Sequence, residues 1–142
     1  MKVPALDSCE PQVMRALEKA AWTILRAPYY LNVAGLIFFA DLRAQQIQTD
    51  NGRSRRIIVA EIKCFANETN DQDELYRAIG QYALYREALR MKGDDDELYL
   101  AVSEPAYQRL LRLHLVARVL HDLGVKLIVI DLEREVIFQW IE

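Results

Sequence analysis

The segment Arg55–Phe65 constrains the fold of this 142-residue chain more than any other. It contains the apolar run Ile57-Ile58-Val59-Ala60, and a run so rich in β-branched residues is typical of a strand covered on both faces. Glu61 and Lys63 follow, and the period-2 geometry of a strand places both side chains on one face. A strand end that runs into solvent with a weak ion pair is the ordinary interpretation of Glu-x-Lys. Because buried charges are costly unless they are paired or bind a metal, a functional site at the end of a central strand is the alternative.

The composition restricts the class of protein. A content of 52% hydrophobic and 27% charged residues is that of an ordinary globular protein, and the length suits a single domain over residues 1–142. The net charge of −3 provides no overall basic field, so any DNA contact must be local or shared with a partner. The densest basic cluster, Arg53 with Arg55 and Arg56, is typical of a solvated hairpin turn. No apolar run approaches the roughly 18 residues of a membrane span and the N-terminus lacks a secretory signal, so we expect a cytoplasmic protein without membrane contact.

The chain has two cysteines, Cys9 and Cys64, which lie far apart and form no metal-ligand spacing. We expect both to be free thiols in a reducing compartment. The domain is then stabilised by its core alone, which a chain of this length can form without cross-links.

Hydrophobic periodicity and turn residues predict the element order α-β-β-β-α-β-α-β-β. The strands are expected at Trp22–Leu25, Leu36–Leu42, Arg55–Phe65, Leu98–Val102, Lys126–Ile130 and Val136–Ile141, and the helices at about Glu10–Ala21, Gln72–Met91 and Pro105–Leu123. Such an order implies an α/β domain with a mixed sheet covered by helices. Tyr29 and Tyr30 are expected in a loop with some extended character. Thr69-x-x-Gln72 predicts a capping box for the second helix, and Gly124 suits the C′ position of the third.

Asp41 ends the second strand, and its position relative to Glu61 depends on the register of a hairpin. The dipeptide Asn51-Gly52 predicts that hairpin, and a strict two-residue turn places Asp41 opposite Ile62, on the wrong face. An offset of one residue, through a β-bulge or a longer turn, places Asp41 opposite Glu61 instead. Two such carboxylates form a natural Mg²⁺ site, and without metal they would raise each other's pKa.

Together, these features resemble the PD-(D/E)xK restriction-endonuclease-like superfamily: an acid in the first helix, an aspartate ending the second strand, Glu-x-Lys on the third strand and a glutamine on the next helix. Within it, the chain closely resembles the XisH family, the fdxN-element excision controlling factor of cyanobacteria. The matching segments cover nearly the whole chain in order: Ala16-Leu17, Trp22-Thr23-Ile24, Tyr30-Leu31, Ala40-Asp41-Leu42, Val59–Lys63, Ile79-Gly80-Gln81-Tyr82, Tyr99–Val102, Lys126–Val129, Glu135-Val136-Ile137 and Trp140-Ile141.

The resemblance implies a role for each matching polar residue. Asp41 and Glu61 would bind Mg²⁺ or Mn²⁺, Lys63 would be the catalytic lysine, and Gln81 would reach toward the site from the second helix. The resemblance to this superfamily includes one departure, because Ala40 stands where its Pro-Asp motif has a proline; this variation is frequent and changes none of these roles.

Two further residues follow from the same resemblance. Glu10 would be the acid of the first helix, and Glu18 is the alternative. Gly80 would allow the second helix to lie close to the sheet, which would explain a glycine within a helix.

The resemblance implies an accessory factor for programmed excision of a DNA element, with a metal-dependent endodeoxyribonuclease site. It also implies DNA, an XisI-like protein and a second copy of the chain as partners. The alternative is a non-catalytic protein- or DNA-binding module on a nuclease-like fold, since fold does not determine function. Convergence of Asp41, Glu61 and Lys63 is the feature that distinguishes the two.

Overall fold

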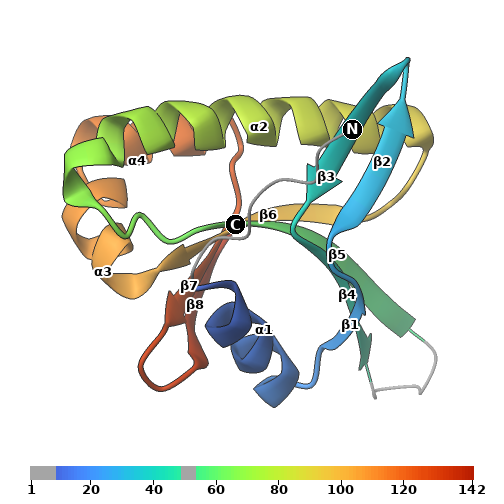
Figure 1. Cartoon of the computed structure of the whole chain (residues 1–142), viewed down its shortest axis with the longest axis horizontal. Helices are drawn as coiled ribbons and strands as arrows, with labels where there is room; N and C mark the ends of the chain where they lie inside the picture. Colours follow the sequence, from blue (N-terminus) through green and yellow to red (C-terminus); the bar gives the residue numbers. More distant parts are fainter. Residues whose placement is uncertain (1–8, 49–53) are drawn as a thin grey trace.

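The computed structural model describes residues 9–48 and 54–142 (Figure 1). A curved sheet runs through the middle of the molecule. Helix α1 (Glu10–Lys19) covers one face, and helix α2 (Asp71–Lys92) crosses the other. The predicted α/β domain with a mixed sheet flanked by helices is confirmed. None of the helices in the described part of the chain is long and apolar enough to cross a membrane.

The main sheet has six strands in the order β1-β4-β5-β6-β7-β8. Their bounds are Thr23–Arg26 (β1), Leu42–Gln48 (β4), Ser54–Lys63 (β5), Glu97–Ser103 (β6), Leu127–Asp131 (β7) and Val136–Ile141 (β8). The β5–β6 and β6–β7 pairs are parallel and the other pairs are antiparallel. Strand β5, which contains the Glu-x-Lys motif, therefore lies inside the sheet, as its apolar run predicts.

Strand β5 separates two hydrophobic cores. Ile58, Ala60 and Ile62 pack in the core under α1. Val59 belongs to the core under α2. Because side chains alternate between the faces of a strand, Glu61 and Lys63 share the face of Val59, toward α2.

The predicted strand Leu36–Leu42 is divided at Asp41. Strand β3 (Leu36–Ala40) pairs with β2 (Tyr29–Val33) in a separate two-stranded sheet, and β4 begins one residue beyond Asp41 in the main sheet. The hairpin β2–β3 stands beside α2 (Figure 1). The expected loop at Tyr29 and Tyr30 is thus a regular strand, in which buried Tyr29 alternates with exposed Tyr30.

The predicted helix Pro105–Leu123 is interrupted. The chain forms α3 (Glu104–Ala106), the π-helical segment η2 (Tyr107–Leu111) and α4 (His114–Asp122), with extended backbone at Leu113. Leu111 and Leu120 are buried in the same core. Nine residues at about 100° each would place them on opposite sides of a straight helix, so the break brings both to the core. Gly124 has a φ of +68° after α4, as a C′ glycine does.

The predicted capping box before the second helix is wrong. Thr69 donates its N–H and its hydroxyl to Oδ1 of Asn67, at 3.1 and 2.8 Å, and this starts the short helix η1 (Glu68–Asn70). Gln72 donates to the Tyr76 hydroxyl at 2.7 Å instead of reaching back. The Thr69 hydroxyl is therefore used in an Asx-type turn with Asn67 and does not cap the second helix.

Gly80 does not serve the close packing that we expected. A Cβ atom built there would meet no atom within 4 Å among the described residues.

Because glycine costs about 0.5–1 kcal/mol relative to alanine inside a helix, Gly80→Ala should stabilise the protein by about that amount. Urea denaturation measures the change. Gly93→Ala is the matched control: Gly93 has a φ of +81°, so this variant should lose stability. A loss of stability in Gly80→Ala would show that the glycine has a packing role after all.

Candidate functional site

The register between β4 and β5 contains the one-residue offset that brings the two acids together. The ladder runs from Leu42 opposite Ala60 to Gln48 opposite Ser54, without a shift. Asp41 precedes Leu42 and Glu61 follows Ala60, so the two acids lie at the same level. The strict two-residue turn would have placed Asp41 opposite Ile62. The predicted turn at Asn51-Gly52 lies outside the described residues.

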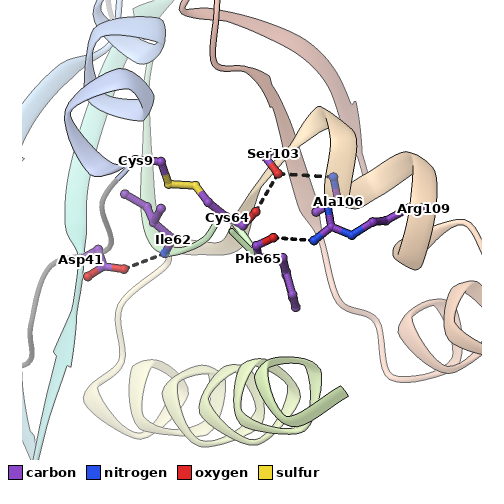
Figure 2. Close-up of a disulfide and its surroundings, with 8 residues drawn as sticks. All are labelled: Cys9, Asp41, Ile62, Cys64, Phe65, Ser103, Ala106 and Arg109. Atoms are coloured by element: carbon purple, nitrogen blue, oxygen red, sulfur yellow. Dashed lines mark hydrogen bonds between the residues drawn. A yellow bond between two sulfur atoms is a disulfide. The ribbon is translucent and has the colours of Figure 1, made fainter. Parts of the chain in front are cut away.

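Asp41 is fixed to the end of β5 by a hydrogen bond from the backbone. The N–H of Ile62 donates to Oδ2 of Asp41 at 2.7 Å (Figure 2). The pairing of β4 with β5 ends at Ala60, two residues before Ile62. The Asp41 carboxylate thus accepts the hydrogen bond of a β5 backbone N–H that lies beyond the end of this pairing. Asp41 is therefore positioned by the strand that contains the Glu-x-Lys motif.

Glu61 is buried, with 5% of its surface exposed, and its surroundings favour the protonated form. The pKa of Glu61 is raised to about 9, mainly by burial and in addition by the charge of Asp41 and a hydrogen bond with Asp41, while the charge of Lys63 lowers it. The expectation that the pair would raise a carboxyl pKa is confirmed for Glu61. Asp41 and Lys63 thus each interact with Glu61 at the end of β5.

Tyr85 is a neighbour of the carboxylates that the sequence did not indicate. Burial, followed by the charges of Glu61 and Asp41, raises the pKa of this phenol well above its usual range. Its hydroxyl donates to the carbonyl of Phe39 at 2.9 Å, which joins α2 to β3 next to the site. No motif or charge pattern distinguishes Tyr85 from the other tyrosines of the helix. Only its place on the sheet-facing side of α2 does.

Gln81 lies four residues before Tyr85, so the two side chains lie on the same side of α2. Its Oε1 atom is enclosed and has no hydrogen-bond partner among residues 9–48 and 54–142, and the same holds for Oε1 of Glu61. Buried acceptors without a donor are costly, and a bound cation is one way to satisfy them. Both atoms fit the assignment of these residues to a polar site.

The two candidate acids of the first helix differ in their surroundings. Glu10 is the first residue of α1 and is 2% exposed, whereas Glu18 is exposed. Helix α1 lies on the face of the sheet opposite α2. Within the described ranges, no group of three or more His, Cys, Asp and Glu side chains could hold a metal ion, so Glu10 does not join Asp41 and Glu61 in one such group.

The two cysteines form a disulfide, and our expectation of free thiols is wrong. Cys9 and Cys64 are 55 residues apart in the sequence, with their Cα atoms 6.4 Å apart (Figure 2). The bond joins the residue before Glu10 to the residue after Lys63. Both sulfur atoms meet because α1 packs on the face of β5 that contains Ile62, which is a contact that sequence spacing cannot show.

The fold and the site define a mixed α/β protein with a buried glutamate, a neighbouring aspartate and a lysine at the end of its central strand. The chain belongs to the XisH family, whose model, described as XisH protein, matches residues 3–138.

Two solved structures are similar over almost their whole lengths. An XisH family protein from Nostoc punctiforme PCC 73102 is 32% identical, with a TM-score of 0.85 over 96% of this chain and 100% of that chain. A fdxN element excision controlling factor protein from Anabaena variabilis is 33% identical, with a TM-score of 0.83 over 93% of this chain and 96% of that chain. No curated protein matches the chain.

Proposed function

We propose that this protein is an accessory factor for programmed excision of a DNA element, with a metal-dependent endodeoxyribonuclease site of PD-(D/E)xK type. The similar protein from Anabaena variabilis is described as a fdxN element excision controlling factor. The observation that supports a nuclease site most is the interaction of Asp41 and Glu61 beside Lys63, at the end of the central strand.

Asp41 and Glu61 are suited to hold Mg²⁺ or Mn²⁺. Both are oxygen donors, and Mg²⁺ keeps several waters and needs only one or two protein carboxylates. The raised pKa of Glu61, and its buried Oε1 atom without a hydrogen-bond partner among the described residues, indicate a carboxyl that a bound cation would hold in its charged form. When bound, such a cation would neutralise the carboxylates and polarise a phosphate oxygen of DNA.

The residues around the pair each have a distinct role in this proposal. Lys63 provides a positive charge next to Glu61, where it would stabilise the negative charge that develops on a phosphate during cleavage. The Ile62 N–H holds Asp41 in place. Gln81 would orient a water molecule or a phosphate oxygen from the α2 side.

A plasmid-nicking assay tests the proposal. With Mg²⁺ present, Lys63→Ala should lower the nicking rate of a supercoiled plasmid by about a hundredfold, since a charge next to the reacting phosphate is lost. Arg55→Ala is the matched control, because Arg55 is an exposed basic residue on the same strand, and within residues 9–48 and 54–142 it donates only to Gln45 Oε1, at 3.3 Å. Equal rates for wild type and both variants would mean a contaminating nuclease.

Absence of nicking by purified wild type would favour the other candidate function, a non-catalytic binding module. The net charge of −3 favours that candidate, because it gives weak attraction to DNA. An XisI-like protein and a second copy of the chain are the partners we propose. Repeating the assay with such a partner present distinguishes an inactive module from a nuclease whose DNA contact is supplied in trans.

A further inference from the structure

The disulfide is placed where it can influence the candidate site. Cys64 directly follows Lys63 at the end of β5, and Cys9 is the N-cap residue of α1. The carbonyl of Cys9 accepts the first helical hydrogen bond of α1, from the N–H of Val13 at 3.1 Å. The covalent bond thus joins the first turn of one helix to the chain that positions the lysine.

The two ends of the bond are held differently. Next to Cys64, the Ser103 hydroxyl donates to the Cys64 carbonyl at 2.7 Å, and Arg109 donates to the carbonyl of Phe65 (Figure 2). Arg109 is itself fixed by a bidentate pair with Asp71, at 2.9 and 3.0 Å. The exit of β5 is therefore attached to β6 and to η2, and the disulfide extends this attachment across to α1.

The bond lies at a pocket of about 310 Å³. Cys9 and Cys64 line it together with Gln12, Ser103, Pro105 and Arg109. A pocket of this size admits a small thiol. Arg109, one of the lining residues, is paired with Asp71 and holds the carbonyl of Phe65 at the same pocket.

We propose that Cys9–Cys64 is a reversible thiol–disulfide site whose redox state controls the order of the first turn of α1 and of the Lys63 end of β5. The reductant is a low-molecular-weight thiol that enters the pocket. A thiolate attacks one sulfur, breaks the Cys9–Cys64 bond and forms a mixed disulfide. A second molecule of the reductant then attacks the sulfur of the first in this mixed disulfide and releases the protein sulfur. The products are two protein thiols and the oxidised disulfide of the reductant. The consequence for DNA cleavage rests on the function proposed above.

Amide hydrogen exchange tests the redox site without any reference to activity. The wild-type protein is compared in its oxidised form and after treatment with dithiothreitol, with alkylation and mass spectrometry to count thiols. Reduction should lower the protection of the Val13 amide at least about tenfold, because its acceptor turn is released. The Ala20 amide, which donates to Ala16 at 3.2 Å at the other end of α1, is the internal control and should change little. Complete reduction with unchanged protection at Val13 would overturn the proposal, as would a bond that resists reduction until the protein unfolds.

The nicking rate with Mg²⁺ tests the link to the candidate site. Reduction should slow wild type about ten- to a hundredfold, since a small displacement of a catalytic group has effects of that size. Cys9→Ser/Cys64→Ser should be slow in both conditions and insensitive to dithiothreitol. If the double variant does not fold, the two forms of wild type still provide the comparison. Loss of protection at Val13 with an unchanged rate would overturn control of the site. An oxidised wild type that never nicks would count against the nuclease proposal, while hydrogen exchange still decides the redox site.

Discussion

Glu61→Gln should stabilise the metal-free protein at about pH 8, and the same variant should be strongly impaired in metal-dependent nicking. These opposite effects have a common cause in the buried carboxyl. Glutamine keeps the size of Glu61 and can donate a hydrogen bond to Asp41, as a protonated carboxyl does, but it cannot bind a cation with a negative charge. We expect the nicking rate to fall about a thousandfold.

The sign of the stability change follows from the pKa of Glu61. It lies near 4.5 in an unfolded chain and is raised to about 9 in the folded protein. Between these values the folded protein retains a proton that the unfolded chain has released. The stability that this proton provides is fully present below about pH 4.5 and is lost as the pH rises toward 9. The loss is on the order of 1.4 kcal/mol per pH unit. Glutamine does not titrate, so the advantage of the variant should grow with pH to a few kcal/mol.

Urea denaturation at about pH 5 and about pH 8, without metal, measures this difference. Glu68→Gln is the control, because Glu68 is exposed at the start of η1 and its replacement should change neither stability nor nicking. A free energy of unfolding for Glu61→Gln that falls with pH as steeply as that of wild type would mean that Glu61 is ionised in the folded protein.

Cys9→Ser/Cys64→Ser should lose about 4 kcal/mol of stability relative to the oxidised protein. Because the bond closes a segment of 55 residues, it restricts the unfolded chain, and the loss of such a restriction has this size in the chain-entropy model. Cys9 and Cys64 are each 4% exposed, so two buried hydroxyls add a smaller cost. Thermal unfolding followed by circular dichroism measures the loss, with reduced wild type as the second form that lacks the bond.

Reduced wild type retains both sulfur atoms in the core, so it separates the covalent contribution from the polar one. It should be less stable than oxidised wild type and more stable than the serine variant. Equal stability of oxidised and reduced wild type would show that the bond contributes nothing to folding.

Local periodicity was sufficient to predict β5 and the shared face of Glu61 and Lys63. Four successive apolar residues and a two-residue spacing are properties of the strand itself. The position of Asp41 was not predictable in the same way, since it depends on whether the connection at residues 49–53 shifts the ladder by one. Both registers, and the position of Asp41 in each, could be derived from the sequence. The observed pairing of Leu42 with Ala60 shows which of the two the protein adopts.

Most of the features that the sequence did not predict depend on contacts between distant parts of the chain. The disulfide needs α1 to lie on β5. The interruption before α4 arises because Leu111 and Leu120 must both reach one core. Tyr85 becomes part of the site because α2 crosses the sheet above Glu61. None of these contacts is indicated by a motif or by the local periodicity of the sequence. The interpretation of Gly80 was wrong for another reason: we assigned it a packing role, whereas a Cβ atom at that position would have space.

Asp41 stands between β3 and β4 and belongs to neither of the two sheets. The ladder that starts at Leu42 and the hydrogen bond from Ile62 therefore set the position of the carboxylate from the side of the main sheet. The tip of the hairpin at Ala34 and Gly35 is exposed, whereas Leu31 is buried in the core and the Phe39 carbonyl binds Tyr85. Changes to this tip are a route to new surface properties that leaves the acid pair intact.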